Sequence, residues 1–179
     1  LTTFNEIDMT AAETLPFRFE RRLLPSGQDR LSLAVGDIVS VNLLRRSEGN
    51  RYTIPRGTVH FGGAAGEPER PGVWVSGAVK TLDIDRWLAL VPQGDAESTV
   101  VWGGVDLRVG ALDVLGRRVN ELTLSAAVQG GQWRGSVSGK EVEGTASWQP
   151  QGRGKLIARM KTFAVPAAAP AAFEAPSTE

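Results

Sequence analysis

Hydrophobic and polar residues alternate along most of the chain, and this period of two is typical of half-buried β-strands. The alternating segments are bounded by Pro, Gly, Asn and Ser residues that favour turns. In the first half these segments are residues 14–24, 30–35, 37–46, 51–63 and 72–79. In the second half they are residues 104–112, 120–128, 132–138, 140–149 and 155–163. The pattern predicts a mainly β protein.

One segment between the two halves follows a helical period instead. Residues 83–91 place their large apolar side chains close to one helical stripe. Asp83 or Asp85 can cap the start of this helix, and Pro92 ends it. We predict one short helix here, followed by a surface loop at residues 93–98.

The alternation and the composition together predict one β section and a tail. Strand-rich halves at residues 1–80 and 100–163 flank the helix at 83–91, and we expect residues 1–163 to form a single section. Residues 164–179 are rich in Ala and Pro, which favours a semi-extended linker.

Three tight turns allow a register to be predicted for the second half. Gly130–Gly131 suits a two-residue turn, because glycine tolerates positive φ, and it places Ala126 opposite Gly135. Turns at Gly139–Lys140 and Gly116–Arg117 extend the pairing into an antiparallel meander. The further pairs are Leu124 with Val137, Val128 with Trp133, Val137 with Val142, Gly135 with Gly144, Val109 with Leu124 and Leu107 with Ala126. The alternation slips near residues 112–114, so we expect a bulge or a strand end there.

The predicted meander has one polar and one apolar face. A line of small residues crosses the apolar face, and glycine in a strand interior often marks the close approach of another group. The line consists of Ala126, Gly135, Gly144 and Ala158. One short helix cannot cover so wide a face. The two halves therefore pack on each other as a sandwich or barrel, or the face forms a groove for an apolar ligand.

Composition narrows the class of protein. The chain has 179 residues with a formal net charge of zero, which favours neither nucleic acid nor an anionic membrane surface as partner. Cysteine is absent, which excludes disulfides and thiolate metal sites. No stretch approaches the roughly 20 apolar residues that span a bilayer, so we expect no membrane insertion by this chain. It begins at Leu1 without an initiator Met, and we expect it to be an internal section of a longer protein.

Motifs that carry chemistry are weak, and we predict neither enzymatic activity nor a metal or other cofactor. His60 is the single histidine, no Gly-x-Ser-x-Gly elbow accompanies it, and a surface or rim position explains it. "GSVSGK" is one residue short of a phosphate loop and is flanked by strands rather than by a following helix. Glu141 and Glu143 fit a solvated strand face better than a glycosidase pair, which normally comes from different strands. Asp83 and Asp85 fit the start of a helix better than a metal site.

Tryptophans are the remaining candidates. Trp133 and Trp148 fall on the predicted apolar face, where they can serve as core, as groove walls or as platforms for a carbohydrate. Aromatic and basic residues are not interleaved in the way that would indicate binding to nucleic acid.

Several segments, in their order and spacing, resemble YhdP-type proteins, which are large AsmA-like proteins of Gram-negative bacteria. The resemblance extends over nearly the whole chain up to Pro166. The segments that carry it are "LPFRFERRLL", "DRLSLAVGDIVSVNLLRR", "GVWVSGAVKTLDIDRWLAL", "LDVLGRRVNELTLSAAVQGGQWRGSVSGKEVEGTASWQ" and "GKLIARMKTFAVP".

The resemblance implies a section of a bridge-like lipid-transfer protein that crosses the periplasm. Such proteins are anchored in the inner membrane by an N-terminal helix, which this chain lacks. Repeated groups of strands form a long, taco-shaped groove, along which phospholipids are thought to move to the outer membrane. Neighbouring groove sections of the parent chain would be its partners. The implied lining consists of Val105, Leu107, Val109, Leu122, Leu124, Ala126, Val128, Trp133, Gly135, Val137, Val142, Gly144, Trp148, Leu156 and Met160.

Three functions therefore stand as hypotheses. The first is a section of a periplasmic groove that conducts phospholipid acyl chains and supports the outer membrane. Each buried CH₂ contributes roughly 0.8 kcal/mol, so shape alone could hold a lipid with little selectivity for its head group. The second is a structural β domain, packed as a sandwich or barrel, that mediates assembly without a ligand. The third is an enzyme or lectin that uses the Trp and Glu residues.

Overall fold

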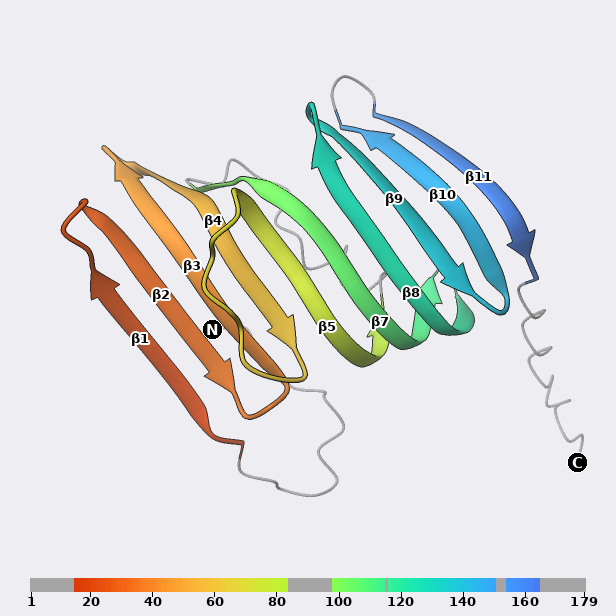
Figure 1. Cartoon of the computed structure of the whole chain (residues 1–179), viewed down its shortest axis with the longest axis horizontal. Coiled ribbons are helices and arrows are strands. Elements are labelled where there is room, and N and C mark those ends of the chain that lie inside the picture. Colours follow the sequence, from red (N-terminus) through yellow and green to blue (C-terminus); the bar gives the residue numbers. More distant parts are fainter. Residues whose placement is uncertain (1–14, 84–97, 115, 151–153, 165–179) are drawn as a thin grey trace, which may run out of the picture.

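A single open β-sheet forms the described part of the molecule (Figure 1). The computed structural model describes residues 15–83, 98–114, 116–150 and 154–164. Within these residues there are strands and no helix. The strands are β1 (Phe17–Leu23), β2 (Gln28–Val35), β3 (Val39–Glu48), β4 (Arg51–Phe61), β5 (Gly72–Asp83), β6 (Ser98–Val100), β7 (Trp102–Val114), β8 (Arg117–Gln129), β9 (Gln132–Gly139), β10 (Val142–Gln149) and β11 (Lys155–Phe163). The prediction of a mainly β protein is confirmed.

The sheet follows the chain order from β1 to β11, with β6 set to one side on β4. Strands β1 to β4 are antiparallel neighbours, and so are strands β7 to β11. Because hairpins of this kind need only short connections, the Gly-rich and Pro-rich turns between the alternating segments are sufficient to form them.

The antiparallel meander predicted for the second half is present as β7 to β11, but the centre of the sheet is parallel, which was not predicted. Strand β5 pairs in parallel with both β4 and β7, and β6 pairs in parallel with β4. The connection at residues 62–71 crosses back over one face of the sheet, as a parallel pair requires. Ser40 donates a hydrogen bond to the carbonyl of Gly63 (2.6 Å), and Asn42 donates one to that of Ala65 (3.0 Å). These side chains hold the crossover against β3.

The predicted helix at residues 83–91 falls almost wholly outside the described residues. Its first residue, Asp83, is the last residue of β5, so the strand extends further than the alternation predicted. The loop predicted at 93–98 ends at Ser98, which begins the short strand β6 that the sequence did not reveal. Most of the predicted linker at 164–179 also lies outside the described residues.

The turn at Gly130–Gly131 has the predicted form. The two glycines have φ values of 58° and 74°, and Leu124 pairs with Val137 as expected. At the other two turns the predicted register is wrong by two residues. The observed pairs are Val137 with Gly144, Gly135 with Ala146, Val109 with Leu122, and Leu107 with Leu124. A shift of two residues leaves every side chain on its predicted face, because side chains alternate with a period of two.

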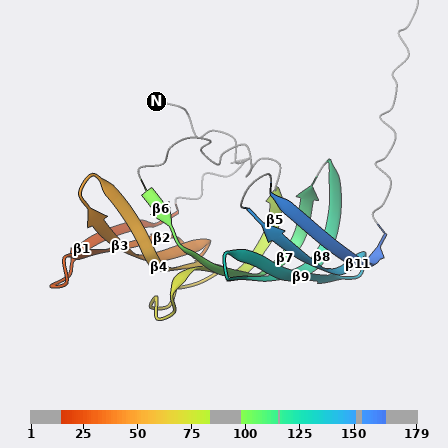
Figure 2. The same cartoon turned by 90° about the horizontal axis from the view of Figure 1, so that it is seen from above.

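Strands β5, β7 and β8 bend sharply near one end, so that the sheet curls (Figures 1 and 2). At the bend, Glu121 has a φ of 49°, and a Cβ atom at Gly110 would lie 2.7 Å from the carbonyl oxygen of Lys80. The sequence predicted a bulge or strand end near residues 112–114. Instead β7 continues to Val114, and the alternation changes phase at the bend while the pairing with β8 keeps its register.

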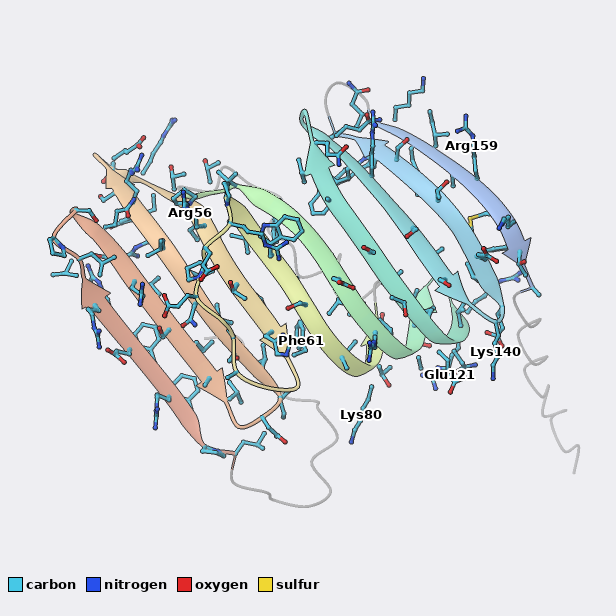
Figure 3. All side chains as sticks on the ribbon, viewed as in Figure 1. Arg56, Phe61, Lys80, Glu121, Lys140 and Arg159 are labelled. Atoms are coloured by element: carbon cyan, nitrogen blue, oxygen red, sulfur yellow. The ribbon has the colours of Figure 1, made fainter. Side chains whose placement is uncertain are left out.

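The bend encloses a cluster of buried hydrophobic side chains. The cluster consists of Leu107, Val109, Leu112, Val119, Leu122 and Val142. Leu112 and Val119 follow the change of phase, so they turn toward the same interior as Val109 and Leu122. Burying a Val or Leu side chain contributes about 1.5–3 kcal/mol, so this cluster stabilises the curl. The apolar face consequently lies on the inner side of the curve. Lys80, Glu121 and Lys140 project outward from this bent margin (Figure 3).

Candidate functional site

The apolar face is continuous across the sheet. One row of directly paired residues, here called the apolar row, crosses every strand from β1 to β11 except β6. It consists of Phe19, Leu33, Val41, Val59, Val75, Val105, Ala126, Gly135, Ala146 and Ala158. Directly paired residues point to the same face, so these side chains form one apolar strip at right angles to the strands. The parallel pairs at β5 join the strip across the two halves.

The next residue along each strand lies on the opposite face, and there the composition reverses. This polar row consists of Ser40, His60, Ser76, Asp106, Ser125, Ser136, Thr145 and Arg159. Along these two rows, the sheet therefore separates apolar from polar side chains from β3 to β11, apart from β6.

All the residues that the resemblance implied for a groove lining lie on the apolar face. They occupy only β7 to β11. The same face continues over β1 to β5 through residues such as Leu33, Val41 and Val59, which the sequence analysis left out of the lining. The alternation in those strands was the signal that could have identified them.

The row of small residues is placed slightly differently from the prediction. Ala146, and not Gly144, pairs with Gly135 and with Ala158, while Gly144 pairs with Val137. Side-chain size along the apolar row falls from Phe and Leu at β1 and β2 to Ala and Gly at β8 to β11. Small side chains leave room above the sheet, so a ligand can approach the backbone most closely over β8 to β11.

Aromatic side chains collect at the margin opposite the bend, which is the edge formed by the β1–β2, β3–β4, β8–β9 and β10–β11 connections. The rings of Trp102 and Trp133 lie 6.4 Å apart between centroids, and Trp133 pairs with Trp148. Trp102 and Trp148 are each 47% exposed. Tryptophan is favoured where one side of a residue is apolar and the other is wet. This margin therefore has the character of a boundary between the apolar face and water.

A charged cluster lies on the apolar face at the same margin, over β1 to β3. The carboxylate of Asp29, which is 8% exposed, accepts hydrogen bonds from Arg21 Nε (3.0 Å) and from Arg45 Nη2. The guanidinium of Arg45 also stacks on the ring of Tyr52, 4.5 Å from its centroid. The hydrogen bond from Arg45 is the main cause that lowers the pKa of Asp29, and the positive charge of Arg21 adds to it, while burial acts in the opposite direction. Asp29 is therefore ionised at neutral pH.

This cluster was not predicted from the sequence. Asp29 and Arg45 occupy positions that alternate in phase with Leu31 and Leu43, and the segments were judged only by their apolar members. A charged residue in phase with an apolar stripe was the signal that could have identified it.

On the polar face, Trp74 packs between the backbone of β7 and a guanidinium group. Its ring lies against the backbone of Gly103 and Gly104, and the guanidinium of Arg70 stacks on the ring 3.9 Å from its centroid. A shallow hollow of about 420 Å³ adjoins it, with Asp106 and the neighbouring serines of the polar row in its lining.

Other candidates for chemistry are separated or engaged. His60, for which a surface or rim position was predicted, is half-buried, and its Nδ1 lies 2.9 Å from Ser76 Oγ. Glu141 precedes β10 and accepts a hydrogen bond from the backbone N–H of Asn120 (3.1 Å), whereas Glu143 pairs with Lys161. The two glutamates therefore have different partners: Glu141 bonds to β8 from just before the start of β10, and Glu143 bonds to β11.

Within the described ranges, no group of three or more His, Asp or Glu side chains is arranged to hold a metal ion. The described residues also contain no helix with the length and hydrophobicity needed to cross a membrane.

Comparison with known proteins identifies a family. A family model described as "YhdP protein" matches residues 6–179. Neither the curated proteins nor the solved structures gave a match. Because the family match extends over almost the entire sequence, the chain belongs to the YhdP protein family.

Proposed function

We propose that the chain is a section of a lipid-transfer bridge, in which phospholipid acyl chains lie on the apolar face. The observation that carries this proposal is the apolar row, which stays apolar over every strand from β1 to β11 apart from β6, on the inner side of a curved sheet. An apolar strip at right angles to the strands can continue from one group of strands to the next. The core of a packed sandwich does not require an apolar strip that continues beyond its own strands.

The energetics agree with a ligand of this kind. Each CH₂ group that leaves water for an apolar surface contributes roughly 0.8 kcal/mol, so two acyl chains can be held without a covalent or metal anchor. The exposed members of the face, among them Ala146 and Ala158, are those that a ligand would cover.

The two ends of the sheet support neighbouring sections as partners. Phe17 and Phe19 on β1 are 68% and 59% exposed, and Leu156 on β11 is 69% exposed. Edge strands that expose large apolar side chains are suited to pairing with further strands. In this proposal the parent protein lies in the periplasm, is anchored in the inner membrane by another segment, and has no catalytic centre in this section.

Photo-crosslinking in cells tests the proposal. Benzophenone-alanine is introduced at Ala158, on the apolar face, or at the adjacent Arg159, on the polar face; both positions are exposed. We expect a phospholipid adduct at position 158 and none at 159. Native mass spectrometry of gently extracted protein should show the same lipids bound. Equal labelling at both positions, or protein with no lipid, would favour a structural β domain that assembles without a ligand.

A further inference from the structure

We propose that Arg21 and Arg45 form a binding site for the phosphate of a lipid head group, at the margin of the apolar face. This inference rests on the proposed function and adds to it a fixed position for the phosphate. The apolar face carries charged side chains, which a groove for acyl chains alone does not need.

The cluster carries a surplus of positive charge. One carboxylate, Asp29, contacts both guanidinium groups, through ion pairs with Arg21 (2.8 Å) and with Arg45. No other carboxylate among the described residues contacts Arg21 or Arg45. Two cations and one anion leave one net positive charge, which a phosphate would neutralise.

Ion pairing alone is a weak reason to place these charges on an apolar face. Taking charges out of water is costly, and replacement of a buried ion pair by apolar residues is often neutral or stabilising. Asp29 stands in phase with Leu31, and Arg21 is paired with Leu31 across the strands, so apolar residues would fit these positions. The charges are better explained by a ligand that needs them.

The geometry leaves donors free for such a ligand. Asp29 contacts Nε and Nη2 of Arg21, and the side chain of Arg21 is 53% exposed, so a ligand can reach it from solvent. The side chain of Arg45 is 23% exposed, and the plane of its guanidinium is fixed by Tyr52. Guanidinium groups match the geometry of phosphate oxygens, and a group held in place by Asp29 and Tyr52 loses little entropy on binding.

The distance to the apolar row suits a phospholipid. Arg21 is two residues from Phe19 on the same face of β1, which corresponds to about 7 Å along a strand. A phosphate at Arg21 would therefore place the first acyl carbons over Phe19 and Leu33, at the start of the apolar row.

Lipid binding by the 179-residue chain tests the site. Two probes share the same acyl chains: dioleoyl phosphatidic acid carries the phosphate, and dioleoylglycerol does not. Each is presented in uncharged detergent micelles, and bound lipid is quantified after gel filtration. We expect Arg21→Gln to retain about tenfold less phosphatidic acid than the wild type, since a hydrogen bond to a charged group is lost, and unchanged dioleoylglycerol. Arg21→Lys should recover part of the loss.

Arg22→Gln is the matched control, because Arg22 is adjacent, lies on the opposite face, and pairs with Glu20 instead. It should bind both lipids like the wild type. Circular dichroism confirms that the variants are folded. If the wild type binds phosphatidic acid and Arg21→Gln binds it equally well, the head-group site is wrong and the proposed function stands. If the wild type binds neither lipid, the proposed function itself fails.

Soluble glycerol 3-phosphate distinguishes a lipid site from a site for free phosphates. We expect it to displace phosphatidic acid only at a large excess, because it has no acyl chains for the apolar row. Displacement at equal concentration would overturn the assignment to a lipid.

Discussion

Trp74 of β5 and Gly104 of β7 are paired on the polar face, and the indole ring occupies the space that a side chain at position 104 would need. A Cβ atom there would also lie 2.5 Å from the carbonyl oxygen of Ala126. We therefore expect Gly104→Ala to lower the free energy of unfolding by about 1–3 kcal/mol, as overpacking does. Urea denaturation followed by tryptophan fluorescence measures the change.

Gly66→Ala provides the control for that substitution. Gly66 lies in the crossover at residues 62–71, and no atom would come within 4 Å of an added Cβ. Its stability should stay within about 0.5 kcal/mol of the wild type, as at ordinary surface positions. Equal stability of the two variants would show that the packing of Trp74 on β7 is not a determinant of stability.

Lipid transfer should be sensitive to charge on one face only. Gly135 and Gly144 are unsuitable for this test, because a Cβ at either would lie 2.6 Å from a backbone oxygen. Ala146 already carries a Cβ, is exposed, and belongs to the apolar row. We expect Ala146→Asp to abolish lipid transfer by the parent protein in a reconstituted vesicle assay, because a carboxylate without a partner repels acyl chains.

Thr145→Asp is the matched variant, since Thr145 is adjacent, also exposed and on the polar face. It should transfer lipid at the rate of the wild type. A folded Ala146→Asp protein with full activity would mean that acyl chains do not pass over this part of the sheet.

The bend should depend on backbone conformation at Glu121. Its positive φ of 49° is accessible to glycine, but costs a β-branched residue about 1–3 kcal/mol. We expect Glu121→Val to be destabilised by this amount and Glu121→Gly to be at least as stable as the wild type. The exposed ion pair of Glu121 with Lys140 (3.4 Å) contributes little to either result.

Thr123→Val, two residues along β8 and also exposed, controls for the introduction of valine. Thermal unfolding should separate Glu121→Val from this control. If the two variants unfold at the same temperature, the bend does not depend on the conformation of residue 121.

Acid should weaken the cluster around Asp29. Because Arg45, and then Arg21, lower the pKa of Asp29, its ionised form is favoured in the folded state. Its contribution to stability is therefore present above the unfolded pKa of 3.8 and is lost as pH falls through the lower folded value. The stability difference between the wild type and Asp29→Asn should be largest near neutral pH and should shrink below pH 3.8.

Urea denaturation at a series of pH values measures this difference. Asp113, whose pKa is lowered mainly by its hydrogen bond from Arg118, should show the same trend in an Asp113→Asn variant. A wild-type curve that stays parallel to that of Asp29→Asn down to pH 2 would contradict the linkage.

The strands and their faces could be predicted because alternation reports directly which side of a strand is apolar. Leu124 and Val137 were paired correctly, since two consecutive glycines at 130 and 131 fix a two-residue turn. Where the connection was not of that kind, as between Val137 and Gly144, the register was wrong by two residues but the face was right.

Strand direction and order could not be predicted in the same way. The alternation of apolar and polar residues is the same in parallel and antiparallel strands. It therefore could not show that β5 pairs with β4 in parallel rather than as an antiparallel hairpin. The side chains that hold the crossover, Ser40 and Asn42, became meaningful only once their carbonyl partners at residues 63 and 65 were known. Strand β6, at Ser98–Val100, is too short for any period to be detected.

The strands lie in the sheet in the order of the sequence, apart from β6, and this has a consequence for how the molecule folds. In the part of the chain that the structure describes, substantial contacts between strands occur only between hydrogen-bonded neighbours, so the stability of the sheet is close to a sum of nearest-neighbour terms, as in solenoid proteins. Strands β1 to β4 and β7 to β11 are joined by short hairpins and can form quickly. The parallel ladders of β5 join residues that are distant along the chain, and such contacts form slowly. We therefore expect two hairpin arrays to assemble independently, with β5 closing the seam between them last.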